Sequence, residues 1–270
     1  MQTSLELIRW FIKQTMAAKP RSLRVEGIIL RHREWGEADR LLTIYTRELG
    51  KIWAIAKGVR KPHSRKGGHL EPFMRSNLLL ARGRTFYILT QAEAIASYLP
   101  LREDLILLGI ASYNIELLDR FVYEEEENRA LFRLLESTLD RLARGDDPDL
   151  VTRYYEIRLL DHVGFRPQLF RCVGCDEEIQ PEDQFFSPLR GGAICPSCGQ
   201  RETEARPVSL QALKYLRHFQ RSSYRDATRA NIGSATNKEL ENLMQYYFTY
   251  ILERRLNSLD FLRHVRQRGS

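Results

Sequence analysis

The stretch LLTIYTRELGKIWAIA, residues 41–56, decides the class of the N-terminal fold. Its two ends, residues 41–46 and 52–56, are short runs rich in β-branched and aromatic side chains, which favour strands. Between them, the segment Glu48–Lys51 contains Gly50, which adopts a positive φ without steric strain and so predicts a tight turn. The sequence therefore predicts two consecutive strands joined by a turn.

Three further runs extend this β region in both directions. A strand-like run begins at Val25 on the N-terminal side. On the C-terminal side, residues 77–81 and 85–90 form a predicted hairpin across Arg82–Arg84, with a loop of three or four residues. Five short strands in some 75 residues predict a Greek-key barrel of the OB type. An SH3-like barrel fits the same count nearly as well, and periodicity alone does not separate the two.

A cationic loop follows the third predicted strand. The segment Lys57–Gly68 holds five cationic side chains and no acidic one, while Pro62 and Gly67-Gly68 keep it out of the sheet. Such a loop suits contacts to nucleic-acid phosphates, which neutralise charge without reading base identity. The alternative is ordinary solvated charge. The predicted DNA-binding residues are the loop cations and the two arginines of the next turn: Lys57, Arg60, Lys61, Arg65, Lys66, Arg82 and Arg84.

Aromatic side chains near the loop offer platforms on which unpaired bases can stack. For most of them, packing in the core is the simpler expectation. The aromatic residues concerned are Trp35, Tyr45, Trp53, Phe73, Phe86 and Tyr87.

Charge is unevenly distributed along the 270 residues. The net charge of +7 conceals a basic segment, residues 23–100, with 14 basic and 7 acidic side chains. Residues 101–160 carry 8 basic and 14 acidic side chains, whereas residues 206–270 carry 12 and 5. A basic excess on a predicted β domain favours a nucleic-acid partner. The apolar runs are far shorter than the roughly 20 residues of a membrane helix, so the sequence predicts no membrane association.

The middle and the end of the chain have helical periodicity. Residues 101–143 carry apolar side chains at helical spacing, with Leu105 at the start of the expected buried face, and Glu124–Glu127 is read as an exposed acidic connector. A third helix is expected from Val151 to near Gly164. Residues 209–218 and 238–256 predict two more, and the polar residues 221–237 predict a loop.

All four cysteines lie in one short stretch as two C-x-x-C pairs. A pair at this spacing turns two thiolates toward one ion, and two pairs complete a tetrahedral shell suited to zinc. Four thiolates leave no open position for water, so a single structural zinc ion is expected, as in an intracellular protein. Asp176 follows the first pair where glycine is usual. The predicted ligands are Cys172, Cys175, Cys195 and Cys198.

Signals for catalysis are missing from the sequence. The six histidines are scattered and form no H-E-x-x-H or H-x-E pattern. Neither a G-x-S-x-G elbow nor a P-loop is present, so neither a hydrolase nucleophile nor a nucleotide cofactor is expected. We therefore expect no catalytic residues and no enzyme activity.

These motifs, in this order and spacing, resemble the RecO family of bacterial DNA repair proteins. The resemblance rests on LRVEGIILR from Leu23, EADRLLT from Glu37, Gly50-Lys51 and AKGVRK from Ala56. It continues through Gly164-Phe165, the two cysteine pairs, and FSP with Gly-Gly between those pairs. It extends over about residues 23–260.

The resemblance implies an α+β multidomain fold with an N-terminal OB-fold β-barrel, a helical domain and an embedded four-cysteine zinc ribbon. It implies a cytoplasmic, nucleoid-associated recombination mediator that binds single- and double-stranded DNA and anneals complementary strands. With RecR as partner, such a protein loads recombinase onto DNA coated by single-stranded DNA-binding protein, whose acidic C-terminal tail it docks. The family's basic loop corresponds to Lys57, Arg60 and Lys61. The tail requires a basic groove beside an apolar helix surface, for which Arg120, Arg129 or Arg133 are candidates.

The expected organisation has five parts: an N-terminal extension over residues 1–22, with helical spacing; the OB-fold domain, 23–100; the first helical part, 101–168; the zinc ribbon, 169–205; and the second helical part, 206–265. Three other functions stay open on the sequence alone. They are a zinc-ribbon transcription or RNA-binding factor, a metal-dependent nuclease, and an interaction adaptor without DNA affinity.

Overall fold

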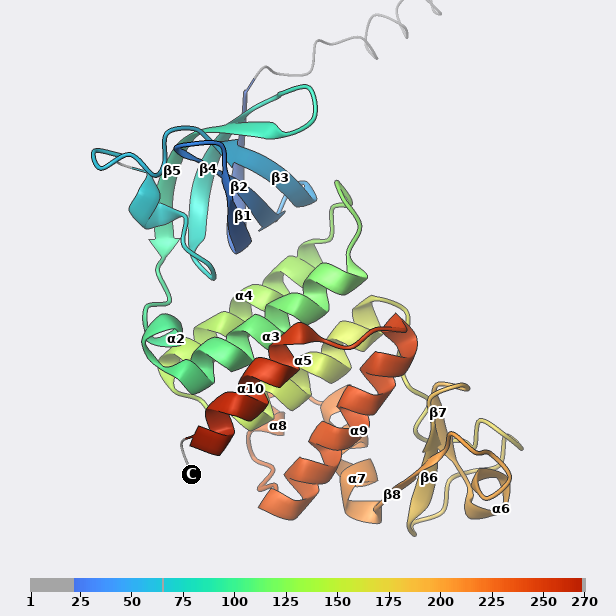
Figure 1. Cartoon of the computed structure of the whole chain (residues 1–270). Helices are drawn as coiled ribbons and strands as arrows, with labels where there is room; N and C mark the ends of the chain where they lie inside the picture. The colour runs from blue at the N-terminus through green and yellow to red at the C-terminus, as the bar shows by residue number, and fades with distance from the viewer. Residues whose placement is uncertain (1–21, 65, 269–270) are drawn as a thin grey trace, which may run out of the picture.

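The computed structural model describes residues 22–64 and 66–268. It is a mixed α+β structure in which a β-barrel, a helical domain and a small ribbon follow one another across the molecule (Figure 1). The predicted N-terminal extension, residues 1–21 of it, lies outside the described residues, and so does Arg65. No helix of the described ranges is long and apolar enough to span a bilayer.

The five N-terminal strands close into a barrel. Their order is β1-β2-β3-β5-β4, and β4 pairs back to β1. Only β3 and β5 run parallel, over Ala54–Ala56, and the other neighbours are antiparallel. This order confirms the OB-type barrel and excludes the SH3-like alternative. The strands are β1 (Ser22–Trp35), β2 (Asp39–Thr46), β3 (Gly50–Ala56), β4 (Arg75–Ala81) and β5 (Tyr87–Ala96), with a short 3-10 turn, η1 (Gly67–His69).

The middle of β1, residues 27–30, and most of β2, residues 41–46, are buried on both faces. Ile29 points into the barrel core with Leu42 and Ile44, whereas Ile28 belongs to the core of the helical domain. Tyr45 likewise leaves the barrel and stacks on Phe132 with ring centroids 6.3 Å apart. Burial on both faces explains why these segments are nearly continuous in apolar residues and do not alternate between apolar and polar side chains.

Most helices begin at a residue whose side chain caps the first turn. Asp104, Asn128, Asp147 and Ser209 each accept hydrogen bonds from backbone N–H groups that the helix leaves free. The helices are α2 (Pro100–Glu103), α3 (Leu105–Phe121), α4 (Arg129–Arg144), α5 (Pro148–His162), α6 (Pro196–Gly199), α7 (Leu210–Arg221), α8 (Tyr224–Ala227), α9 (Ser234–Leu252) and α10 (Asn257–Arg268).

The structure corrects the sequence expectations in five places. Leu105 is 60% exposed and does not belong to the buried face of α3. Residues 221–237 contain α8, whose Ala227 is fully buried, and residues 257–268 form a helix that the periodicity did not indicate. The connection between β4 and β5 spans five residues, 82–86, and not three or four. The backbone of the acidic connector pairs with β3 at Lys51, although the connector's side chains are exposed as expected.

The ribbon is a three-stranded sheet fixed to the helices. It contains β6 (Gln184–Ser187), β7 (Gly192–Ile194) and β8 (Arg206–Val208), in the order β7-β6-β8. Phe186 of β6 packs edge-on against Tyr247 of α9, with centroids 5.0 Å apart. Apolar side chains of the ribbon and of the helices form one continuous core, so the two parts depend on each other for stability.

Opposite charges join the barrel to the helical domain. Asp119 of α3 pairs with Arg31 at 3.3 Å and with Lys51 at 3.2 Å. Arg75 of β4 pairs with Glu136 of α4. Part of the basic excess of the barrel is therefore neutralised by the acidic helices. The uneven charge along the sequence is compatible with this pairing but does not identify the paired residues.

Alanine substitution at two glycines of positive φ, Gly50 at the start of β3 and Gly36 after β1, should destabilise the protein to very different extents. Gly50 has φ +68° and a Cβ there would lie 2.0 Å from the backbone oxygen of Glu126, whereas Gly36, with φ +58°, has open space around it. Alanine at Gly36 is expected to lower the unfolding free energy by about 1–2 kcal/mol, through the left-handed backbone alone. Alanine at Gly50 adds a backbone clash, so its loss should exceed that of Gly36→Ala by at least about 2 kcal/mol in urea unfolding. Equal losses would show that the connector does not rest on the barrel.

Candidate functional site

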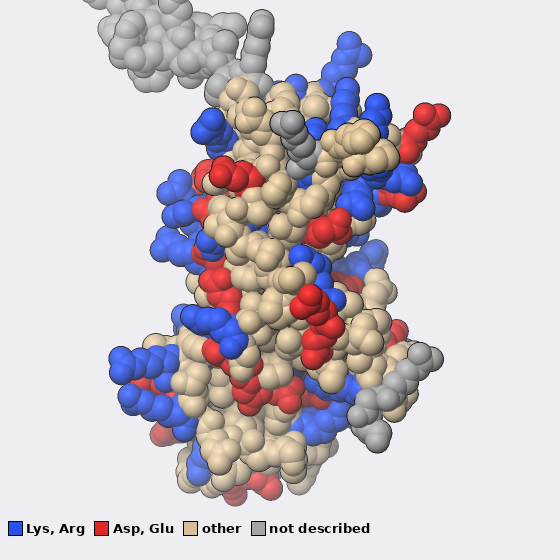
Figure 2. Space-filling view, turned by 90° about the vertical axis from the view of Figure 1, so that its left-hand side faces the viewer, with Lys and Arg blue, Asp and Glu red and all other residues tan. Residues whose placement is uncertain are grey.

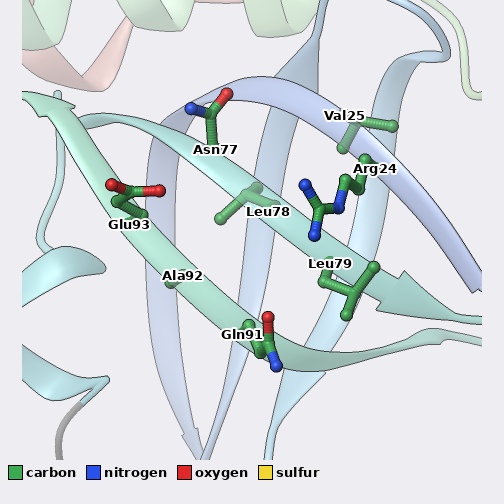
Figure 3. A pocket seen from close by; sticks show the side chains of 8 residues that line it. All are labelled: Arg24, Val25, Asn77, Leu78, Leu79, Gln91, Ala92 and Glu93. Atoms are coloured by element: carbon green, nitrogen blue, oxygen red, sulfur yellow. The ribbon is translucent and has the colours of Figure 1, made fainter.

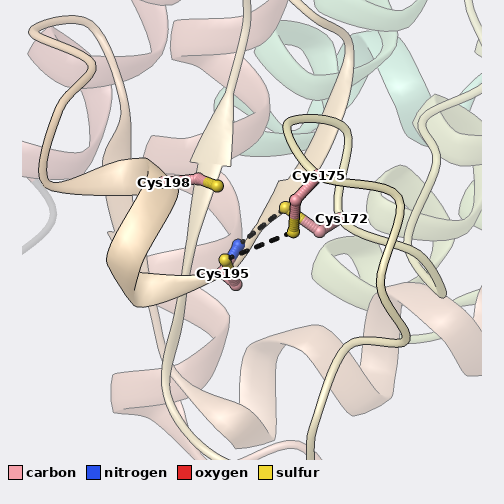
Figure 4. A group of neighbouring side chains, drawn as sticks. All are labelled: Cys172, Cys175, Cys195 and Cys198. Atoms are coloured by element: carbon pink, nitrogen blue, oxygen red, sulfur yellow. Dashed lines mark hydrogen bonds between the residues drawn. The ribbon is translucent and has the colours of Figure 1, made fainter.

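The four cysteines converge at one end of the ribbon (Figure 4). Cys172 and Cys175 come from the loop after α5, Cys195 follows β7, and Cys198 lies on α6. Their four sulfur atoms all lie within 4.8 Å of one another, and those of Cys175 and Cys195 are 3.9 Å apart. Four sulfurs placed about 2.3 Å from a tetrahedral ion would be about 3.8 Å apart, so the cluster can hold such an ion.

The backbone around the cluster favours thiolates. The N–H groups of Gly174 and Cys195 each donate to the Cys172 sulfur at 3.3 Å. Burial opposes ionisation, but the surrounding N–H donors outweigh it and lower the pKa of Cys172 to about 6. Hydrogen bonding to Cys195 and partial desolvation raise the pKa of Cys198 to about 12. Four adjacent thiols therefore do not all ionise by themselves, and four thiolates would form together only with a cation among them to compensate their charge.

Local sequence choices hold this loop in shape. Asp176, where glycine is usual, has φ +62°, and Arg171 donates to its carboxylate at 2.8 Å. Aspartate is one of the few side chains that tolerate this conformation. A Cβ at Gly199 would lie 2.6 Å from the Phe185 ring, so this glycine allows close packing of α6 on β6 and is not needed for a left-handed turn.

The structure also places the predicted DNA-binding residues. Lys57, Arg60 and Lys61 are exposed on the loop after β3, and Lys66 is half-buried. Arg82 and Arg84 are exposed on the loop between β4 and β5. Lysines and arginines lie over the barrel at the top of Figure 2, with acidic side chains among them.

The loop cations are not equivalent. Arg60 pairs with Glu34 at 3.0 Å, and its guanidinium also donates to the Glu37 carbonyl. The Lys66 ammonium donates to two backbone carbonyls, those of Lys57 and Leu89, and so fixes the loop against β5. Among the loop cations of the described ranges, Lys57 and Lys61 pair with no acidic side chain and are free to meet phosphates.

Two hollows on the barrel differ in charge. One, of about 530 Å³, lies between the loop and β5 and is bordered by Lys61, His63 and Lys66. The other, of about 460 Å³, lies across β1, β4 and β5, where Figure 3 shows Arg24 and Glu93 among polar and apolar side chains. The first suits a polyanion, whereas the mixed charges of the second do not.

The comparisons with known proteins agree with this architecture. The family model described as Recombination protein O N terminal matches residues 21–98, and the model of its C terminal matches residues 102–260. The DNA repair protein RecO of Roseiflexus sp. (strain RS-1) is 44% identical over 249 residues, which is 92% of this chain and 88% of that protein. The chain belongs to the RecO family.

Two other RecO proteins cover the chain to a similar extent. That of Dehalococcoides mccartyi (strain ATCC BAA-2100 / JCM 16839 / KCTC 5957 / BAV1) is 39% identical over 92% of this chain and 98% of its own length. That of Symbiobacterium thermophilum (strain DSM 24528 / JCM 14929 / IAM 14863 / T) is 34% identical over 90% and 97%. The RecO C-terminal model spans α3 to β8 and beyond without interruption, which is the arrangement expected of a ribbon inserted within a helical domain.

The three candidate arginines for docking an acidic tail lie in different environments in the RecO fold. Arg129 pairs with Glu127 at 2.7 Å on the connector. Arg120 borders a hollow of about 640 Å³ between barrel and helices, together with apolar side chains such as Phe73 and Leu108. It is partly neutralised by Glu116, 3.2 Å away. Arg133 lies exposed on α4.

A second group of barrel cations was not predicted from the sequence. Arg31 and Arg33 lie at the C-terminal end of β1, beyond the expected strand. Both border a hollow of about 470 Å³ together with Trp53 and Phe86. The signal was present as the alternation R-H-R-E-W, residues 31–35, which places Arg31, Arg33 and Trp35 on one face of an extended strand.

Proposed function

We propose that this RecO-family chain is a DNA-binding recombination mediator of DNA repair that works in the cytoplasm at the nucleoid. It binds single- and double-stranded DNA, promotes the annealing of complementary strands, and with RecR helps load recombinase onto DNA coated by single-stranded DNA-binding protein. Two findings support this: the family, whose named relatives are DNA repair proteins, and a barrel that displays unpaired cations.

The observation that carries the proposal is the contrast between paired and unpaired barrel cations. Arg31, Lys51 and Arg75 face acids of the helical domain, whereas Lys57 and Lys61 face solvent beside a hollow. The positive field of the barrel is therefore concentrated on the loop side. A phosphate backbone that contacts this side releases its counterions, which gives binding without sequence preference.

A second cationic surface at α7 supplies what annealing needs. Arg221 lies over the Phe170 ring, 3.5 Å from its centroid, and Arg217 lies 5.0 Å from the same centroid. Arg225 is exposed one turn further on, in α8. Two DNA strands repel each other, and a protein with cations on separate surfaces screens both. Annealing by this route needs neither ATP nor any covalent step, so we propose that the protein is not an enzyme.

We also propose that the cysteine cluster holds one structural zinc ion. Thiolates at this spacing suit zinc, and four of them leave no position for a reacting water. The ion would close the loop of Cys172 and Cys175 onto α6. The acidic tail of the coating protein is proposed to dock in the hollow beside Arg120, where cationic and apolar side chains meet.

The test is the binding of a fluorescent single strand across salt concentrations, with and without the coating protein, followed by an annealing assay. We expect affinity to fall with salt, complexes to form on coated DNA, and annealing to proceed without ATP. The same titration with RNA and with a duplex tests the alternative of a zinc-ribbon transcription or RNA-binding factor, which the ribbon fold allows. A preference for RNA or for one duplex sequence would favour that alternative.

A further inference from the structure

The structure divides the aromatic side chains of the barrel into two groups. Tyr45, Phe73 and Tyr87 are 0%, 2% and 7% exposed and belong to the cores. Trp35 is 38% exposed, and Trp53 and Phe86 are partly exposed. None of these last three belongs to either core of the described residues. We call Trp35, Trp53 and Phe86 the aromatic platform.

The three rings of the aromatic platform form one group on the outer face of the barrel. Phe86 meets Trp35 edge-on at 5.8 Å between centroids and Trp53 edge-on at 6.2 Å. They come from three separate places, the end of β1, the middle of β3 and the loop before β5. The pairing register sets Arg31, Thr43 and Trp53 directly opposite one another on adjacent strands, so these side chains share one face.

Two rings of the platform, Trp53 and Phe86, border a hollow of about 470 Å³, and cations stand at its rim. Arg33 lies over the Trp35 ring, 5.5 Å from the centroid, and no acid of the described ranges pairs with it. The side chain of Arg31 is 65% exposed although it also pairs with Asp119. The floor is Leu41, which is 5% exposed and yet belongs to neither core.

We propose that the aromatic platform is a stacking site for the unpaired bases of a single strand, separate from the phosphate contacts of the basic loop. This inference rests on the proposed function, because it presumes that the protein binds DNA. Flat rings beside the exposed side chains of Arg31 and Arg33 match what a single strand displays, namely base faces and phosphates together. A duplex hides its base faces by stacking, so the site selects single strands.

The platform and the basic loop adjoin each other, so one strand can reach both. The turn between β1 and β2 begins after Trp35, and Arg60 of the loop contacts that turn twice. Its backbone N–H donates to the Ala38 carbonyl at 2.9 Å, and its guanidinium donates to the Glu37 carbonyl at 3.3 Å. A strand whose phosphates lie on the loop therefore has the rings within the reach of its next bases.

The experiment separates stacking from charge by comparing two strands of equal charge. One is an oligo-dT of about 15 nucleotides, and the other is an abasic strand of the same length without bases. In a Trp10→Phe background, Trp35 and Trp53 are the remaining tryptophans, and their fluorescence reports contact directly. We expect oligo-dT to quench this fluorescence and the abasic strand to leave it largely unchanged.

Variants then measure the contribution of the rings. Trp53→Ala is expected to weaken oligo-dT binding by about fivefold to a hundredfold, as for the loss of one stacked base, without changing the salt slope. Trp53→Phe, which keeps a ring, should retain most of the affinity, and duplex binding should change less than twofold. Tyr123→Ala is the control, because Tyr123 is an aromatic residue 77% exposed just before the acidic connector and is not one of the three rings of the aromatic platform.

The possible failures are distinguishable. Equal quenching and equal affinity for both strands, with no effect of Trp53→Ala, would overturn the stacking site and leave the electrostatic function intact. Quenching by a poly-glutamate peptide as strong as that by oligo-dT would assign the platform to an acidic protein segment and would also overturn the proposal. Absence of binding to any oligonucleotide at low salt would contradict the proposed function itself.

Discussion

Replacing Cys172 by serine is expected to abolish metal binding and to unfold the ribbon. The binding free energy of a structural zinc ion in small domains is about 10–16 kcal/mol, comparable to the whole stability of a typical protein. The ribbon has only short strands of three or four residues, so apart from the core that it shares with the helices little else holds it. Metal content should fall from about one ion per chain to nearly none, measured by elemental analysis after gel filtration.

The effect should extend into the helical domain and stop before the barrel. Ribbon and helices share one core, in which Phe186 contacts Tyr247, whereas the barrel interior has its own core. We therefore expect hydrogen exchange to accelerate in α7 and α9 and to change little in β2 and β3. A strong zinc chelator should reproduce the result with the unaltered chain. The matched control is Ser197→Ala, which removes only a hydroxyl 3.2 Å from the Cys195 sulfur and should keep the ion. Unchanged metal content and melting temperature in Cys172→Ser would contradict the structural role.

The barrel could be predicted from the sequence because its strands are local patterns. Runs such as residues 41–46 are rich in β-branched residues, and Gly50 marks the turn, so no distant contact is needed to recognise them. The cysteine cluster was predictable for the same reason, since two C-x-x-C pairs at this spacing indicate a metal site without any information from distant segments. The five strands and the converging sulfurs of the structure follow these patterns.

The failures involve residues whose environment is set by distant segments. The helix α10 is rich in charge, and it packs on α3 where Gly109 leaves room for Leu262. This contact joins segments about 150 residues apart, which no periodicity encodes. Leu105 was misassigned because α3 is apolar around much of its circumference and its buried side depends on the elements that pack against it. The pairing of Arg60 with Glu34 likewise requires the register of the folded barrel.

Alanine substitution of the cationic loop is expected to weaken binding to single-stranded DNA by up to about three orders of magnitude at low salt. Each phosphate contact on a single strand contributes about 0.7 to the slope of log affinity against log salt, so five contacts would contribute about 3.5. The full variant replaces every loop cation: Lys57, Arg60, Lys61, Arg65 and Lys66. An unchanged salt slope would show that the loop does not contact the DNA phosphates.

The structure divides that total unequally among the side chains. Lys57→Ala with Lys61→Ala should lower the slope by about 1.4, because both cations are exposed and unpaired within the described ranges. Arg60→Ala should lower it by clearly less than about 0.7, since Glu34 already neutralises that guanidinium. The control is Arg201→Ala with Arg206→Ala on the ribbon, two exposed arginines that pair with no acid in the described ranges. It removes the same charge from the other end of the molecule and should leave the slope nearly constant. Equal effects of the loop and ribbon pairs would mean that binding responds to net charge alone, and that the free cations of the barrel do not guide the strand.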